Sequence, residues 1–315
     1  MPRVICAGHV NWDVTLHVDD LPAPDGEAQV REVQAAGGGS AANVACGLAG
    51  LRLDAALLGS VGGDSHGTEA RHELAAAGVD TTGVQVVPDR PTAVKYIAVD
   101  DHGEVMIFGT PGANEAFDTD ALSVDSIDGA DHLHLTGQSP TTARRLAALA
   151  GDLGLSVSLD PGRLVGERDF GAVLDRVDVL FLNGREAALA LADGRESARD
   201  DAGAGLGIES ETRAVVIKRG PNGAEVRTDS RRYTHPGFAA DVVDTTGAGD
   251  AFAAGYLAAT LDEASVEDAL TVGNACGALA AETRGARAEL SWGAVETMRA
   301  RGVEVEREPV GEHGE

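Results

Sequence analysis

The chain has 315 residues, and 43% of them are hydrophobic, which is enough for a large core in one or two domains. The formal net charge is −26 at pH 7, and this acidity argues against nucleic acid and anionic membranes as partners. The acidic residues are spread along the chain, so we favour a halophilic protein of a salt-rich cytoplasm, where the Debye length falls to ~3 Å, over an ordinary solvated surface.

The cysteines indicate the compartment. Cys6, Cys46 and Cys276 are odd in number and far apart, and no CxxC occurs. This pattern favours a reducing compartment and argues against a disulfide framework or a zinc site. The chain starts directly in an apolar, strand-like run, and no run reaches transmembrane length. We therefore expect a cytoplasmic protein.

Along the chain, short β-branched runs alternate with Ala-rich helical stretches. Strands are expected at 3–8, 55–61, 131–136, 155–160, 178–182 and 214–218. Helices are expected at 40–51, 66–78, 140–152, 184–192, 249–260 and 265–282. The alternation predicts parallel βαβ units with helices on both faces of a sheet. Ligands bind such sheets beyond the carboxyl ends of the strands, so the strand-to-helix junctions are the candidate site.

Two segments interrupt this alternation. Residues 12–35 and 92–112 have an extended, alternating pattern that predicts a small sheet beside the main domain, either a lid over the site or only an edge hairpin. Residues 193–213 are expected to form an exposed loop. We assign residues 1–303 to a single domain and residues 304–315 to an acidic, frayed tail.

A Gly-rich junction, DTTGAGDAF at residues 244–252, suggests an anion-binding turn. It has neither the P-loop spacing nor the GxGxxG spacing, but its glycines and the following helix N-terminus favour an anion. Asp250 in this turn has two interpretations. It is either a helix N-cap or a base that accepts a hydroxyl proton during phosphoryl transfer.

The longer run DTTGAGDAFAAGY resembles the C-terminal signature of the PfkB, or ribokinase-like, sugar kinases, and GGGSAANVA at 37–45 resembles their N-terminal signature. The resemblance implies an α/β fold, a three-layer α/β/α sandwich with a mostly parallel central sheet and a small β-sheet lid. It also implies ATP and Mg²⁺ as cofactors. Carried over, it makes Asp250 the catalytic base and assigns the anion hole to the backbone amides of Gly247, Ala248 and Gly249.

The resemblance also implies residues for the acceptor. GHVNWD at 8–13 is similar to the ribokinase start GxxNxD, whose Asn and Asp bind sugar hydroxyls, and the i, i+2 spacing puts both side chains on one face of an extended segment. The implied acceptor-binding residues are Asn11, Asp13, Gly38, Gly39, Asn43 and Gln138.

Three further stretches resemble nucleotide and cation elements of the family: NGRE at 183–186, KRGPNG at 218–223 and TRGAR at 283–287. The implied nucleotide-binding residues are Asn183, Glu186, Lys218, Gly220, Gly223 and Asn274, and the first two would also bind Mg²⁺, largely through water. A K⁺ site is implied at the backbone of Asp244, Thr246, Arg284 and Gly285. Taken alone, Glu186 is an ordinary surface helix residue and KRGPNG an ordinary turn.

The sequence departs from the ribokinase pattern at two positions of the acceptor site. Ser40 stands where ribokinases have a lysine, and Gln138 stands where they have a glutamate. Phrases such as SLDPG and DVLFLNGRE are closer to archaeal nucleoside kinases and ribose 1-phosphate kinases of the family. We therefore favour a nucleoside or a pentose derivative as acceptor, with fructose-type sugars as an alternative. Lid sheets of this family pair between subunits, so a homodimer is expected.

A catalytically silent sugar or nucleotide sensor on the same fold is the alternative from another class. A lost base or a broken anion hole would favour the sensor, and the sequence shows neither defect. A Rossmann dehydrogenase fits less well, because no strand-GxGxxG-helix is followed by a correctly placed acidic residue.

Overall fold

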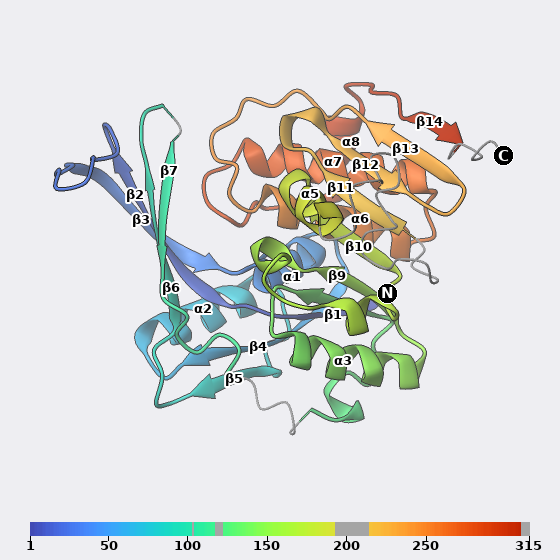
Figure 1. The fold of residues 1–315 in the computed structure, drawn as a ribbon, viewed down its shortest axis with the longest axis horizontal. Coiled ribbons are helices and arrows are strands. Elements are labelled where there is room, and N and C mark those ends of the chain that lie inside the picture. The colour runs from blue at the N-terminus through green and yellow to red at the C-terminus, as the bar shows by residue number, and fades with distance from the viewer. Residues whose placement is uncertain (103, 117–121, 193–213, 310–315) are drawn as a thin grey trace.

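The computed structural model describes residues 1–102, 104–116, 122–192 and 214–309. Its centre is a ten-stranded sheet (Figure 1). In spatial order the strands are β14 (Glu306–Pro309), β13 (Arg231–His235), β12 (Ala224–Arg227), β11 (Ala214–Lys218), β10 (Val179–Asn183), β9 (Ser156–Asp160), β8 (His132–Thr136), β1 (Arg3–Ala7), β4 (Asp54–Gly62) and β5 (Val84–Val87).

From β11 to β5 every neighbouring pair of strands is parallel. The remaining strands β12, β13 and β14 extend the sheet in antiparallel pairs. The carboxyl ends of the parallel strands therefore meet at one edge of the sheet, where the expected site residues also lie.

Helices cover both faces of this sheet. One core cluster contains side chains of α1 (Ser40–Gly50), α2 (Ser65–Ala76), α6 (Ala248–Leu261), α7 (Val266–Ala281) and α8 (Trp292–Arg299). The other contains side chains of α3 (Pro140–Leu153), α4 (Gly171–Leu174) and α5 (Gly184–Ala192). Alternate residues of β1 enter opposite clusters, Val4 and Cys6 the first and Ile5 and Ala7 the second, as the two-residue period of a strand requires. The three-layer arrangement follows.

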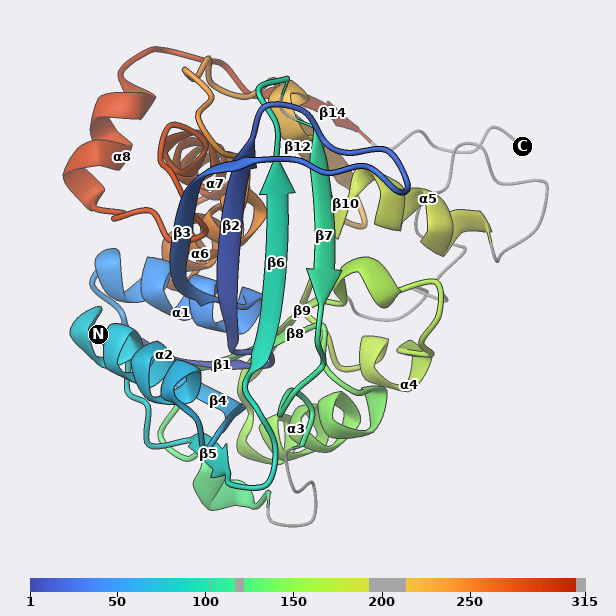
Figure 2. The same ribbon diagram turned by 90° about the vertical axis from the view of Figure 1, so that its left-hand side faces the viewer.

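A second sheet has the strand order β3 (Val30–Gly38), β2 (Asn11–Val18), β6 (Ala93–Val99) and β7 (Val105–Gly109). Figure 1 shows it standing away from the main body, and Figure 2 shows its strands face on. The predicted small sheet is confirmed. We call these four strands the lid sheet.

Several elements differ from the expectations. Strands β5, β12 and β13 and helices α4 and α8 were not predicted, and short 3₁₀ turns occur at η2 (Val124–Ser126), η3 (Gly162–Leu164) and η5 (Gly220–Asn222). The prediction of a frayed tail is wrong for Glu306–Pro309, because these residues form β14 and pair with β13. The expected loop at 193–213 and the last residues, 310–315, lie outside the described part of the chain. Within that part, no helix is long and apolar enough to cross a bilayer.

Candidate active site

The residues expected to bind the acceptor lie where the lid sheet joins the main body. Asn11 and Asp13 of β2 are 1% and 8% exposed. Asn11 Nδ2 and Asp13 Oδ1 are buried without a hydrogen-bond partner among the described residues. A buried polar atom without a partner costs about 1–3 kcal/mol, so both atoms indicate a polar ligand at this place.

The glycines of the N-terminal signature leave room for these polar groups. A Cβ on Gly38 would lie 2.0 Å from Asp13 Oδ2, and a Cβ on Gly39, whose φ is 98°, would lie 2.3 Å from the carbonyl oxygen of His9. Strand β3 can therefore pass directly beside the Asp13 carboxylate only because these positions are glycine. Burial raises the pKa of Asp13, and the charges of Lys95 and Arg287 oppose this shift.

The C-terminal signature forms the turn that begins α6. Gly247 is its N-cap with φ 76°, and a Cβ there would lie 2.1 Å from the carbonyl oxygen of Ala286. Ala248 and Gly249 are the first two helical residues, and Asp250 follows within the first turn. The N-cap interpretation of Asp250 is therefore wrong, and its carboxylate is left for another partner.

That partner is Asn43 of α1, whose Nδ2 donates to Asp250 Oδ2 at 2.8 Å. Arg287 fixes Asn43 in turn, because its Nε donates to Asn43 Oδ1 at 3.2 Å and its Nη2 to the Gly38 carbonyl at 3.2 Å. Asn43, expected as an acceptor-binding residue, thus also orients the predicted base.

Burial raises the pKa of Asp250 to about 6. The Asn43 amide lowers the pKa, the nearby carboxylate of Asp160 raises it, and Lys218 and Lys95 lower it. These are the only two lysines in the sequence. A carboxylate with a pKa near 6 is mostly ionised at neutral pH yet basic enough to take a hydroxyl proton.

Lys218, at the end of β11, lies among three carboxylates. Its Nζ donates to Asp160 Oδ2 at 2.5 Å. Burial opposes its charge, but Asp160, Asp250 and Glu186 outweigh burial and raise its pKa. Asp160 was not among the predicted site residues, although its position at the carboxyl end of the parallel strand β9 was a signal for a site residue.

A cavity of about 740 Å³ lies on the other side of the α6 turn. Five of the six predicted nucleotide-binding residues line it together with Ala248 and Gly249: Asn183, Lys218, Gly220, Gly223 and Asn274. Its walls also include apolar side chains such as Phe238, Val242 and Phe252. The volume and the mixture of apolar walls with a few polar groups suit a small-molecule ligand.

Asn183 and Glu186, the NxxE pair, form a capping box at the start of α5. The Asn183 amide N–H donates to Glu186 Oε2, and the Glu186 amide N–H donates to Asn183 Oδ1, both at 2.8 Å. Glu186 is 4% exposed, so it is not an ordinary surface residue. Burial and then the charge of Asp160 raise its pKa.

The two loops of the expected K⁺ site lie together. Asp244 accepts hydrogen bonds from the Thr246 amide at 2.8 Å and from the Gly285 amide at 2.9 Å. The side chain of Arg284 points to the lid sheet, where its Nη1 lies 3.4 Å from Glu32 Oε2.

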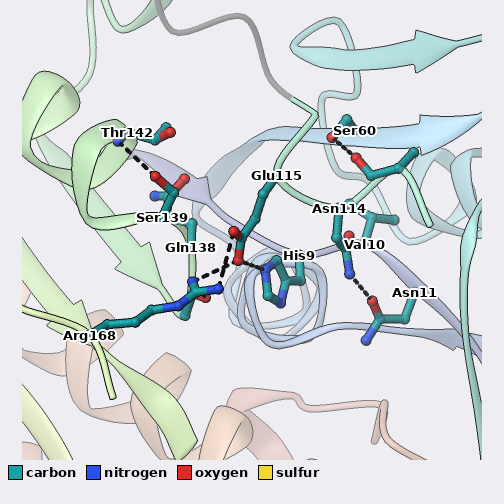
Figure 3. A network of polar contacts seen from close by, with 12 residues as sticks. His9, Val10, Asn11, Ser60, Asn114, Glu115, Gln138, Ser139, Thr142 and Arg168 are labelled. Atoms are coloured by element: carbon teal, nitrogen blue, oxygen red, sulfur yellow. Dashed lines mark hydrogen bonds and ion pairs between the residues drawn. The ribbon is translucent and has the colours of Figure 1, made fainter. Parts of the chain in front are cut away.

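Gln138 was also expected to bind the acceptor, and its Nε2 donates to the Ala7 carbonyl at 3.1 Å. Figure 3 shows a polar network around it that sequence analysis missed. The network contains His9, Asn114, Glu115 and Arg168. Each of these residues contacts a partner that is distant in the sequence, so no local pattern could predict the network.

The chain is similar in sequence to a family of known proteins. The model of the pfkB family carbohydrate kinases matches residues 1–292. The ATP-dependent ribose-1-phosphate kinase of Halopiger xanaduensis is 52% identical over 91% of this chain and 94% of that protein. The nucleoside kinase of Methanothermobacter thermautotrophicus is 28% identical over 84% of each chain.

The same fold occurs in a solved structure. A ribokinase of Thermotoga maritima superposes with a TM-score of 0.84 at 23% identity, over 95% of this chain and 99% of that one. The predicted three-layer fold is thus confirmed. The chain belongs to the pfkB family of carbohydrate kinases.

Proposed function

We propose that this carbohydrate kinase transfers the γ-phosphoryl group of ATP to a hydroxyl of ribose 1-phosphate. One observation carries the kinase assignment. Ala248 and Gly249 line the large cavity, while the next residue, Asp250, bonds to Asn43 on the acceptor side. A donor in the cavity and an acceptor beside Asn11 and Asp13 would therefore meet at the α6 turn.

In the proposed reaction Asp250 accepts the proton of the attacking hydroxyl. The amides of Gly247, Ala248 and Gly249 and the N-terminus of α6 stabilise the negative charge on the transferred phosphoryl group. Lys218 adds a positive charge at the same turn. Its Nζ lies beside Gly249, 3.5 Å from the position that a Cβ would occupy there. Closure of the lid sheet would exclude water and so favour transfer to the acceptor over hydrolysis.

Mg²⁺ would neutralise charge on the ATP phosphates. The described residues contain no group of three His, Cys, Asp or Glu side chains placed to hold a metal. The chemistry of Mg²⁺ suits such a site, because the ion keeps several waters and binds through one or two carboxylates plus phosphates. Glu186 and Asn183 would contact it through water. The two loops that contain Asp244 and Gly285 would offer backbone oxygens to a K⁺ ion.

The acceptor is inferred from relatedness and from the site. The relative at 52% identity is named as a ribose-1-phosphate kinase, while the nucleoside kinase is far less similar. Gln138 supports a phosphorylated acceptor, since an amide in place of the ribokinase glutamate removes one negative charge from this position.

The test is an acceptor panel with Mg-ATP in concentrated KCl, with ADP release as the readout. The panel contains ribose 1-phosphate, ribose, nucleosides and fructose. We expect kcat/KM for ribose 1-phosphate to exceed that for each other acceptor by roughly 100-fold or more, because binding sites built for a polar group reject analogues that lack it. Phosphorus NMR should show a second phosphomonoester on the product.

Either of two outcomes would contradict the proposal. If an unphosphorylated nucleoside or sugar gave the highest kcat/KM, the kinase would stand but the acceptor would be wrong. If the folded protein bound ATP and no acceptor released ADP, the silent sensor would be the better description.

A further inference from the structure

The acceptor region has two ends with different charges. At one end lie Asp250 and two cations. The charge of Lys95 lowers the pKa of both Asp13 and Asp250, and the charge of Arg287 lowers that of Asp13. Lys95 on β6 is the register partner of Asp13 on β2, so both side chains lie on one face of the lid sheet. A phosphate at this end would occupy the place of the transferred phosphoryl group.

The opposite end begins at Asn11. Asn114 Nδ2 donates to Asn11 Oδ1 at 2.6 Å, and Asn114 Oδ1 accepts from the Val10 amide at 3.3 Å. The next residue, Glu115, turns toward His9 and Arg168 (Figure 3). An acceptor that lies along Asn11 with its hydroxyl at Asp250 thus has its other end beside this cluster.

Arg168 holds Glu115 with both branches of its guanidinium. Nη1 donates to Glu115 Oε1 at 2.7 Å and to the Gly137 carbonyl at 3.2 Å, and Nη2 donates to Glu115 Oε2 at 3.2 Å. His9 Nε2 lies 3.0 Å from Glu115 Oε1. The side chains of Arg168 and Glu115 are each 25% exposed and that of His9 28%, so all three remain partly accessible to a ligand.

The cluster has the features of an anion subsite. A guanidinium fork binds phosphate in the same two-pronged geometry in which it binds a carboxylate. The contacts with Glu115 and Gly137 use three of the five N–H groups of Arg168 and pre-orient it. Glu115 has φ 60°, a left-handed conformation that is costly outside glycine and often marks a functional site.

We propose that Arg168 and His9 form the subsite for the phosphate that the acceptor already carries, and that this phosphate replaces the Glu115 carboxylate on Arg168. The inference rests on the proposed function, because it assumes a phosphorylated acceptor. In the free enzyme Glu115 positions Arg168 and balances its charge. The doubly charged phosphate is the stronger partner for the guanidinium, and the neutral Gln138 beside Gly137 does not oppose it.

The test compares Arg168→Gln with Arg144→Gln, which removes the same charge from an exposed position of α3. We expect Arg168→Gln to raise the KM for ribose 1-phosphate by roughly 10- to 100-fold, the loss of a hydrogen bond between charged groups. The KM for ATP, the kcat and the binding of unphosphorylated ribose should change little. Arg144→Gln should match the wild type, and Arg168→Lys should recover part of the loss.

Glu115→Gln separates a phosphate subsite from a structural ion pair. It removes a competing anion, so the KM for ribose 1-phosphate should fall or stay level. A merely structural pair predicts that both variants weaken the binding of ribose and ribose 1-phosphate alike, and that result would overturn the inference. So would an unchanged KM in Arg168→Gln. If the wild type does not phosphorylate ribose 1-phosphate, the proposed function fails first, and the wild-type measurement alone shows it.

Discussion

At the scale of single residues, the protonation of Asp250 sets the pH at which the enzyme works. Burial raises its pKa to about 6, and only the ionised carboxylate can accept a proton. We therefore expect kcat/KM to be level above pH 7 and to fall about tenfold per pH unit below pH 6. A profile between pH 4.5 and 8 with saturating Mg-ATP measures this.

Two variants serve as controls for that profile. Asp250→Asn should lose about 10²–10⁴-fold in turnover and bind ATP almost as the wild type does in calorimetry. Asn43→Ala removes a hydrogen bond that lowers the pKa of Asp250, so the fall in kcat/KM should move to higher pH. Near-normal turnover of Asp250→Asn would refute the assignment of the base.

At the scale of elements, the lid sheet presents apolar side chains to solvent. All five residues of β7 are exposed, and Phe108 and Val33 are each 60% exposed. Exposed apolar strands of this kind mark interaction surfaces, and we predict a homodimer through the lid sheet. Light scattering after gel filtration should give twice the chain mass of 32.2 kDa.

The matched variants for the dimer are Phe108→Asp on β7 and Val124→Asp on η2, away from the lid sheet. Phe108→Asp should weaken dimerisation by roughly 100-fold, as the loss of a central apolar anchor does. Val124→Asp should remain dimeric. A wild type that stays monomeric at high concentration would show that the exposed face serves another purpose.

Local pattern predicted most of the parallel sheet and its helices but not its antiparallel edge. The strands β12, β13 and β14 are short and rich in charge, so they read as loops. The structure shows what supports them. The fully buried Glu225 forms ion pairs with Arg219, Arg227 and Arg232, and neutralised charges can occupy a strand that hydropathy rejects.

In the candidate site too, local pattern predicted some residues and not others. Local motifs located Asp250, Gly220 and Gly223, because each lies in or directly after a Gly-rich turn. Arg168, Glu115 and His9 have no such turn, and Glu115 is separated in sequence by 53 positions from Arg168 and by 106 from His9. A single sequence does not show which of its distant residues come into contact in the fold.

At the scale of the whole molecule, a charge of −26 repels itself strongly in dilute buffer. Salt screens this repulsion, with a Debye length of ~3 Å at 1 M. We predict that the thermal unfolding midpoint rises by roughly 10 °C or more between 0.1 and 3 M KCl. Thermal unfolding monitored by circular dichroism at both salt concentrations measures this midpoint.

Sucrose at matched osmolality is the control for salt, because it stabilises by exclusion from the surface without screening charge. It should reproduce only a small part of the effect. An unfolding midpoint that does not depend on KCl would show that the acidity is ordinary surface charge.

The hydrogen bonds from Arg287 to Asn43 and from Asn43 to Asp250 join residues that are translated far apart in time. Arg287 is translated 244 residues after its partner Asn43. At roughly 5–20 residues per second, the interval between them is on the order of ten seconds to a minute. During translation the nascent chain therefore carries both signature loops before Arg287 is present to hold Asn43, and a chain that ends before Arg287 lacks this contact.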